Sequence, residues 1–410
     1  VKVTGDASIL DDSVPFIEGT ELAAGEQEAF STPLVSAQSA PVWEHCRRAM
    51  ERAWKLGSHG LPLFGAGDWN DGMNRVGIEG RGESVWLAWF FCDVLESFTK
   101  LAESHEFAQA HIATWRRWAA ELAADVERSC WDGEWYLRGF FDDGSPLGSH
   151  INSEAKIDSV VQSWAVISGT ANSARGLTAI GSANLHLMDE HNRLVRLFAP
   201  PFDHSTPNPG YIMGYPPGLR ENGGQYTHGA LWMASAWARL GFGDMATRIL
   251  TILNPVESSR NPAMVARYRG EPYVVAADVY AASGHAGQAG WTWYTGSAGW
   301  MYRIAVEHIF GIRVEAVDRP AVTWLLPRAN ACVAPRQRLQ VVATSSAVVS
   351  SVGFFDGNRQ IGRVRRNVAG VYELTWRTAS ATKGPHVLRA VASDVRGRES
   401  EASLPVRVCR

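Results

Sequence analysis

The period of the apolar residues changes once along this 410-residue chain, near Asp318, and this change constrains the fold more than any other feature. Before it, apolar residues recur every three or four positions, as on the buried face of an α-helix. After it, short Val-rich runs alternate with turn residues, as in β-strands. The chain is therefore expected to be mainly α, with a helical domain over residues 1–313 and a small β-sandwich over residues 319–410.

The helical part is expected to contain several long helices joined by large loops. The expected helices are Pro41–Leu56, Glu83–Ser104, His105–Cys130, Ile157–Ile167, Thr227–Gly241 and Ala298–Phe310. Two loops, Pro200–Tyr226 and Asn254–Pro272, are long and rich in Gly, Pro and aromatic residues. Loops of this kind usually build a site. Helices with large loops at one end describe a helical toroid better than a short-loop bundle.

The C-terminal part is expected to contain six short strands, with a turn at Asp356-Gly357. The expected strands are Ala321–Leu325, Arg338–Thr344, Val349–Phe355, Val371–Trp376, His386–Ser393 and Ser403–Val408. Cys332 and Cys409 lie near the two ends of this domain, so the sequence leaves a disulfide between them open.

The bulk composition excludes several classes of partner. The formal net charge is −3, so no basic excess is available for binding nucleic acid. No apolar run approaches the roughly 20 residues of a membrane span. The N-terminus has neither a basic region nor an apolar stretch, which predicts a cytoplasmic location. Seventeen Trp residues suit a cleft for sugars, although helical cores also use Trp, and the composition does not decide between the two.

Three segments concentrate polar and aromatic residues. The first, Gly67–Asn74 (GDWNDGMN), places two carboxylates, an amide and an indole within four positions; a solvated turn is the plain alternative. The second, Pro216–His228, places Arg, Glu, Asn, Gln and His on a Gly-rich approach to a helix start. The third, Gly290–Trp300, opens a helix with small residues after an aromatic run, so its N–H groups can bind an anion or simply allow close packing.

Together these segments resemble the family of inverting phosphorylases that includes cellobiose and chitobiose phosphorylases. The likeness is strongest to the phosphorylase-like domain of cyclic β-1,2-glucan synthases. It covers residues 1–313 and includes Gly67–Glu83, Asn208–His228 and Glu271–Arg303. The resemblance implies an (α/α)6 toroid. The family's N-terminal β-sandwich and several of its helices have no counterpart here, so the toroid is expected to be incomplete.

The resemblance also assigns roles to individual residues. It implies that Asp71 is the general acid. It implies phosphate contacts from Arg81, His228, Thr295 and Gly296. It implies sugar contacts from Asp68, Trp69, Glu221 and Asn222, with Glu221 at the acceptor-side sugar. The C-terminal segment resembles bacterial immunoglobulin-like modules instead of the usual C-terminal part of the family.

The residues are chemically consistent with phosphorolysis. An inverting hydrolase needs an acid and a base, whereas a phosphorylase needs only the acid because phosphate is already an anionic nucleophile. A nearby carboxylate, from Asp68 or Glu221, can keep the acid protonated near neutral pH. The expected reaction is phosphorolysis of β-linked, β-1,2-linked by preference, gluco-oligosaccharides to α-glucose 1-phosphate. Phosphate is then a co-substrate, and no metal or organic cofactor is expected.

Two alternatives stay open at this point. An inverting hydrolase would need a second carboxylate poised over a water molecule, and Glu221 and Asp278 are the candidates. A carbohydrate-binding or inactive fragment of a cyclic β-glucan synthase is the non-enzymatic alternative, because sugar contacts of the family are missing here. The sequence also leaves a homodimer open.

Overall fold

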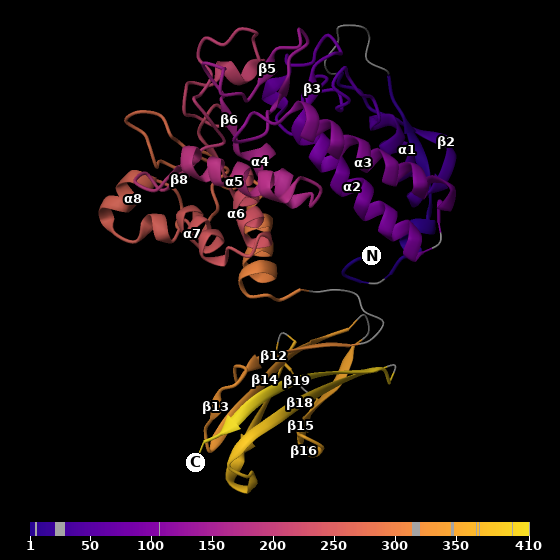
Figure 1. Ribbon diagram of the computed structural model, residues 1–410, viewed down its shortest axis with the longest axis vertical. Helices are drawn as coiled ribbons and strands as arrows, with labels where there is room; N and C mark the ends of the chain where they lie inside the picture. The colour runs from indigo at the N-terminus through magenta and orange to yellow at the C-terminus, as the bar shows by residue number, and fades with distance from the viewer. Residues whose placement is uncertain are drawn as a thin grey trace. The chain divides into compact units, whose positions relative to one another are not determined.

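The computed structural model describes residues 1–4, 6–20, 29–105, 107–313, 320–345, 348–365, 367–368, 370–395 and 397–409. The chain divides into two compact units (Figure 1). The helical unit is Leu10–Ile312, and the β unit is Arg313–Arg410 together with Val1–Ile9. Most of the boundary expected between residues 313 and 319, including Asp318, lies outside the described residues.

The helical unit begins with a hairpin that the sequence did not predict, formed by β1 (Ser13–Glu18) and β2 (Leu34–Pro41). Helix α1 (Val42–Ala53) follows directly, with Pro41 as its extended N-cap residue. The helix expected to reach Leu56 ends three residues earlier, where the Trp54 amide bonds back to the carbonyls of Met50 and Glu51.

The next six helices pack as three consecutive pairs, which Figure 1 shows in colours from purple through magenta to pink. They are α2 (Val85–Ser104) with α3 (Ile112–Ser129), α4 (Ser159–Ile167) with α5 (Ser173–Leu187), and α6 (Thr227–Arg239) with α7 (Gly243–Leu253). The first helix of each pair also contacts the first helix of the next. Helix α9 (Ser297–Arg303) continues this inner row against α6 and runs into a π-helical turn, Ile304–Ile309.

Burial distinguishes the inner row, α2, α4, α6 and α9, from the outer row, α3, α5 and α7. Every residue of α6 from Gly229 to Trp237 is buried, whereas α3 buries only a stripe of four residues. A helix that is buried on all sides lies in the interior, and a striped helix lies at the surface. Two layers of paired helices are consistent with the predicted incomplete (α/α)6 toroid, and the ring as a whole stays a prediction.

Each inner helix of the three pairs starts from a two-residue strand that pairs with a loop. Strands β3 (Glu83–Ser84), β6 (Ile157–Asp158) and β10 (Gln225–Tyr226) precede α2, α4 and α6. They pair with β4 (Gly139–Phe140), β9 (Phe198–Ala199) and β11 (Asp278–Val279). The pairing fixes the loops over the N-terminal ends of the inner helices, which is where the predicted site residues lie.

Several elements of the helical unit were missed or misjudged from the sequence. Helices α5 and α7 were not predicted, nor were the short strands, which also include β5 (Pro146–Leu147), β7 (Met188–Asp189) and β8 (Leu194–Val195). The expected loop Asn254–Pro272 is wrong in part, because it contains helix α8 (Pro262–Tyr268). Asn261 caps this helix and Pro262 occupies its first turn, an arrangement that favours helix initiation.

The β unit consists of two sheets. The strands are β12 (Ala321–Leu326), β13 (Cys332–Val333), β14 (Arg336–Thr344), β15 (Val349–Asp356), β16 (Arg359–Val364), β17 (Val371–Arg377), β18 (Gly384–Asp394) and β19 (Glu399–Val408). One sheet has the order β12-β14-β17 and the other β13-β19-β18-β15-β16. The six expected strands are present, and β13 and β16 are additional. Gly357 has a φ of +57° in the turn that joins β15 to β16, as the Asp-Gly pair predicted.

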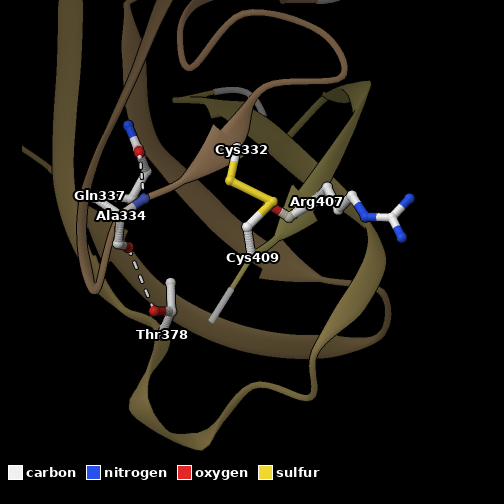
Figure 2. The surroundings of a disulfide bond; sticks show 6 residues. All are labelled: Cys332, Ala334, Gln337, Thr378, Arg407 and Cys409. Carbon is white, nitrogen blue, oxygen red and sulfur yellow. Dashed lines mark hydrogen bonds between the residues drawn. A yellow bond between two sulfur atoms is a disulfide. The ribbon is translucent and has the colours of Figure 1, made fainter.

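Alternating apolar side chains from both sheets form the core of the β unit, including Leu339, Val352, Phe354 and Leu388. Cys332 and Cys409 form a disulfide with a Cα–Cα distance of 5.7 Å (Figure 2). Cys332 opens β13, which pairs in parallel with the end of β19, so the bond joins two neighbouring strands. The bridge that the sequence left open is therefore present.

Over the described ranges of the chain, no helix combines the length and the apolar character that a membrane crossing requires.

Candidate active site

The acid loop, Gly67–Asn74, leads into a short 3-10 helix that starts at Asp71. Gly67 has a φ of +130°, and a Cβ there would lie 3.0 Å from the Asp71 Cα, so the turn requires glycine. The Asn70 side chain accepts a bond from the Gly72 amide at 3.2 Å and holds the turn. Asp71 itself is exposed, so its carboxyl group is accessible to a ligand.

A tyrosine from a distant segment contacts the predicted acid. Burial raises the pKa of Tyr211 well above its usual range, and a hydrogen bond to Asp71 raises that pKa further. The backbone holds the two segments together, because the Arg75 amide donates to the Pro209 carbonyl at 3.1 Å. The Tyr211 amide likewise donates to the Asn74 side chain at 3.1 Å. The acid loop and the start of the long loop Pro200–Tyr226 therefore form one wall.

A buried ion network anchors the acid loop from below. Both Asp68 carboxylate oxygens accept bonds of 2.6 Å from Arg138, and the Ser84 hydroxyl donates to one of them at 2.6 Å. Arg138 also lies 3.4 Å from Asp158, and burial raises the pKa of Asp158 to about 6 although Arg138 opposes that shift. Ser84 and Asp158 cap α2 and α4, so the network fixes the loop over two helix starts.

This network corrects the role predicted for Asp68. The Asp68 side chain has no exposed surface, and Arg138 is 2% exposed. A carboxylate that is enclosed and bonded in this way cannot reach a sugar without breaking the ion pair, which is costly in the interior. The structure therefore gives Asp68 a positioning role instead of the predicted sugar contact.

Trp69 of the acid loop lies against the start of α6. Its ring centroid is 5.6 Å from that of His228 and 5.1 Å from that of Trp232. The His228 ring is also 4.4 Å from Trp232 and 6.0 Å from Trp300 of α9. His228 thus lies in a Trp-lined environment that joins the acid loop, α6 and α9.

His228 is half-buried, and its Nε2 atom is buried without a hydrogen-bond partner within the part of the chain that the structure describes. Burial lowers the pKa of His228 to about 4, so the ring is neutral near pH 7. A buried polar atom without a partner is costly, and a bound ligand can satisfy it.

Thr295 and Gly296 lie at the start of α9, which packs on α6. The Thr295 hydroxyl is 2.5 Å from the Ser297 hydroxyl and accepts a bond from the Ser297 amide. Gly296 is exposed, with no atom within 4 Å of the position of a Cβ. The packing of α6 on α9 supports a shared site with His228, and the convergence of these three residues on one anion stays a prediction.

Arg81 lies in an acidic environment instead. Its guanidinium pairs with Glu79 at 2.5 Å and donates to the Asp142 backbone carbonyl. It lines a pocket together with Asp142 and Asp143. Carboxylates repel an anion, so this setting disfavours the predicted phosphate contact, and none of the interactions described for Arg81 joins it to His228.

Glu221 is 9% exposed and shares a tyrosine with the acid loop. The Tyr226 hydroxyl bonds to Glu221, and burial together with the charge of Glu221 raises the pKa of Tyr226 to about 12. The charge of Asp71 contributes to the same shift, so both carboxylates act on one hydroxyl. The Tyr226 ring lies 5.6 Å from Trp69. Tyr226 therefore links Glu221 to Trp69 and feels the charge of Asp71, and a common sugar site for these three residues stays a prediction.

Asn222 is fully buried and holds the loop that carries Glu221. Its side-chain amide donates to the carbonyls of Phe202 and Tyr215 at 2.9 and 2.7 Å, and its oxygen accepts from the Phe202 amide at 2.8 Å. With these bonds made and no exposed surface, Asn222 shapes the loop. The predicted sugar contact does not fit this environment.

Asp278 is also fully buried. One of its oxygens accepts from the Trp291 amide at 2.9 Å, and burial raises the pKa of Asp278. A Cβ at Gly290 would lie 2.4 Å from that carboxylate, so glycine is needed for this close approach. An enclosed carboxyl of this kind is poorly placed to activate a water molecule, which weakens one of the two candidates for a hydrolytic base.

Sequence analysis missed the residues that position the site. Arg138 is the single charge in an otherwise apolar and aromatic run, Trp135–Phe141, and this isolation was a usable signal. Tyr226 stands in the quoted motif before His228, but nothing marked its hydroxyl as the link between Glu221 and Asp71. In the portion of the chain that the structure covers, no three His, Cys, Asp or Glu residues gather as a metal site would require.

Comparison with known proteins is consistent with this arrangement. The chain is 47% identical over 326 residues to cyclic beta-(1,2)-glucan synthase NdvB of Rhizobium meliloti, covering 79% of this chain and 11% of that protein. It is 31% identical to solabiose phosphorylase of Paenibacillus borealis, with coverage of 76% and 38%. It is 30% identical to N,N'-diacetylchitobiose phosphorylase of Vibrio furnissii, with coverage of 76% and 36%.

The chain thus spans well under half the length of each of these relatives. The matched family model is the catalytic domain of the glycosyl hydrolase 94 superfamily, over residues 1–311, which include the acid loop, His228 and the start of α9. This chain therefore belongs to the glycosyl hydrolase 94 superfamily.

Proposed function

We propose that this chain catalyses inverting phosphorolysis of β-linked gluco-oligosaccharides, giving α-glucose 1-phosphate and a shortened saccharide. The observation that supports this most is the 5.6 Å contact between Trp69 and His228. The acid loop holds the only exposed carboxyl of the Asp-Trp-Asn-Asp motif, and this contact brings it to a half-buried imidazole whose buried Nε2 has no partner in the described chain. A proton donor and an anion site are the two parts that phosphorolysis needs.

In the proposed reaction, a phosphate oxygen attacks the anomeric carbon from the α face. The bond from that carbon to the β-glycosidic oxygen breaks, and Asp71 gives its proton to the leaving oxygen. His228 acts as a neutral N–H donor to phosphate, since burial lowers its pKa to about 4. Thr295 and Gly296 would supply the remaining donors. The Arg138–Asp68 pair holds the acid loop so that the proton transfer needs no reorganisation.

The choice of a gluco-oligosaccharide with β-1,2 linkages rests on the relative from Rhizobium meliloti, whose name refers to a cyclic beta-(1,2)-glucan. The relatives named for solabiose and N,N'-diacetylchitobiose phosphorylases support the phosphorolytic reaction type. Independence of metals and organic cofactors, a homodimeric state and a cytoplasmic location are further parts of the proposal that await measurement.

The test is to incubate the chain with linear β-1,2-gluco-oligosaccharides with and without inorganic phosphate, and to quantify glucose 1-phosphate and free glucose. The proposal expects glucose 1-phosphate only when phosphate is added. It expects His228→Ala to raise the phosphate concentration that gives the half-maximal rate. Release of free glucose at a rate independent of phosphate would instead identify an inverting hydrolase, with Glu221 as the leading base. Saccharide binding with neither product would support a binding fragment.

A further inference from the structure

Four exposed aromatic side chains lie in two contacting pairs between residues 273 and 294. They are Tyr273, Trp291, Trp293 and Tyr294, with exposed fractions of 74%, 53%, 72% and 67%, and we call them the aromatic platform. The rings of Trp291 and Tyr294 lie 5.3 Å apart, and those of Tyr273 and Trp293 lie 6.3 Å apart. Large aromatic groups left in water are unfavourable, so a cluster of them marks a surface that binds something.

The backbone beneath the aromatic platform is held in an unusual conformation. Trp293 has a φ of +62°, a region that a bulky side chain rarely occupies. The Trp291 amide is fixed to the Asp278 carboxylate at 2.9 Å, and its carbonyl accepts a bond of 2.7 Å from the Ala277 amide. Strain of this kind persists where the surroundings enforce it, and it concentrates at ligand-binding segments. In this segment the residue with the positive φ, Trp293, has its ring in solvent.

Charged groups flank the aromatic rings. The Arg220 guanidinium lies 4.5 Å from the centre of the Trp291 ring. The Trp293 indole N–H donates to the Glu271 carboxylate at 3.1 Å, which fixes the edge of that ring while the ring stays 72% exposed. A sugar ring presents apolar C–H groups on its face and hydroxyl groups at its rim. The flat aromatic rings fit the C–H face of a sugar, and the guanidinium and carboxylate beside them can bond to its hydroxyl groups. An apolar protein surface would fit the rings but would leave the charged groups without partners.

The aromatic platform is also continuous with the proposed active site. Arg220, which covers Trp291, lies 3.4 Å from Glu221. Glu221 accepts the hydroxyl of Tyr226, whose ring lies against Trp69 of the acid loop. Contacts therefore lead without a break from the acid loop to the platform, on the side of the site where Glu221 is predicted to hold the acceptor sugar.

We propose that the aromatic platform is an extended subsite for glucosyl units beyond the cleaved bond, so that this chain selects oligosaccharides longer than a disaccharide. The inference rests on the proposed function, because that function defines on which side of the cleaved bond the platform lies. In the bound state, the exposed faces of Trp293 and Trp291 stack on successive glucosyl units, and Arg220 and Glu271 bond to their hydroxyl groups. A disaccharide occupies the site near Asp71 and does not reach the platform.

The experiment measures binding by calorimetry without phosphate, using gluco-oligosaccharides of two and six units with β-1,2, β-1,3 or β-1,4 linkages. We expect the six-unit compound of the preferred linkage to bind about 10-fold more tightly than the disaccharide. A factor of this size is what one additional aromatic contact typically contributes. Trp293→Gly removes the ring and relieves the positive φ. It should abolish this length dependence, leave disaccharide binding unchanged and not lower the melting temperature.

Phe242→Ala is the matched control, since Phe242 is 46% exposed but lies beyond the end of α6 opposite to His228. The control should keep the full length dependence. Equal binding of short and long saccharides by the unaltered chain would overturn the subsite, and so would an unchanged length dependence in Trp293→Gly. Release of glucose 1-phosphate is recorded separately, so absence of phosphorolysis refutes the proposed function without deciding whether the platform binds glucan.

Discussion

The two units of this chain differ in how many charged side chains they bury. The helical unit encloses Arg138, Asp68, Asp158, Glu83 and Asp278 beneath its loops. The β unit has a mainly apolar core, a disulfide at one end, and one buried carboxylate, Asp394, which pairs with Arg398 at 2.8 Å. Buried charges are costly unless they are paired, so a unit that keeps them is using them to position something. The larger number of buried charges in the helical unit supports placing the proposed site there.

A second contrast lies within the site itself. Asp68 and Asp71 are three positions apart in one motif, yet Asp68 is enclosed by Arg138 while Asp71 is exposed beside Tyr211. One carboxylate positions the loop and the other is free to react. The predictions below separate these roles, and they separate the helical unit from the β unit.

The largest expected effect is that of Asp71→Asn. The variant keeps the shape and removes the proton donor, so the rate on a natural β-gluco-oligosaccharide should fall about 10²–10⁴-fold. An activated aryl β-glucoside, whose leaving group needs no proton, should lose far less. The measurement is the phosphorolysis rate on both substrates, with Asp203→Asn, a residue with 58% side-chain exposure, as the control. Equal losses on both substrates would mean that Asp71 positions the sugar.

Arg138→Met should mainly reduce stability of the helical unit. It leaves the buried Asp68 and Asp158 without their cation, and breaking a buried pair in this way costs about 3–5 kcal/mol. Hydrogen exchange should accelerate in the acid loop and in the starts of α2 and α4, with no change in β14 to β19. Arg117→Met, at a surface position with 63% side-chain exposure, should change the free energy of unfolding by less than about 0.5 kcal/mol. A similar effect from both variants would refute the anchoring role.

Loss of the disulfide should affect the β unit alone. The bond spans 77 residues, and removing such a bridge typically costs about 2–4 kcal/mol. In the Cys332→Ser/Cys409→Ser variant, hydrogen exchange should rise in β13 and β19, while saccharide binding by the helical unit stays the same. A loss of binding in this variant would show that the β unit contributes to the site.

The smallest expected effect concerns pH. Burial lowers the pKa of His228 from 6.5 to about 4, so the unfolded chain takes up this proton first as the pH falls. The contribution of neutral His228 to the free energy of unfolding is therefore complete above pH 6.5 and is lost as the pH falls from about 6.5 to 4. Gln does not titrate in this range, so His228→Gln should escape this loss. The difference in melting temperature, variant minus unaltered chain, should therefore be more positive at pH 5 than at pH 7.5. A constant difference across this range would mean that His228 is not buried and neutral.

Sequence patterns predicted the parts of the molecule that depend on local periodicity. Helices α2, α4 and α6 and six strands of the β unit follow from apolar spacing, and the acid loop follows from its dense polar composition. Which carboxylate of that loop is enclosed does not follow, because it depends on Arg138, which lies 70 residues further along the chain. The enclosure of Asn222 does not follow either, since its partners are the backbone groups of Phe202 and Tyr215.

The short strands before the inner helices were also beyond prediction. Two-residue segments such as Gln225–Tyr226 have no period of their own, and they are strands only because Asp278 and Val279 lie beside them. The acidic environment of Arg81 could not be predicted, because the carboxylates of Asp142 and Asp143 come close to it only in the folded chain. Contacts between distant parts of the chain thus set the environments of site residues that the sequence did not predict.

The measurement that most directly tests the central claim is the stereochemistry of the phosphorylated product. Proton and phosphorus NMR would follow a linear β-1,2-gluco-oligosaccharide incubated with this chain and inorganic phosphate. If the acid loop and the His228 region act on opposite faces of one anomeric carbon, α-glucose 1-phosphate and a saccharide shortened by one unit must appear in equal amounts. Formation of β-glucose 1-phosphate, or of free glucose without consumption of phosphate, would contradict the account.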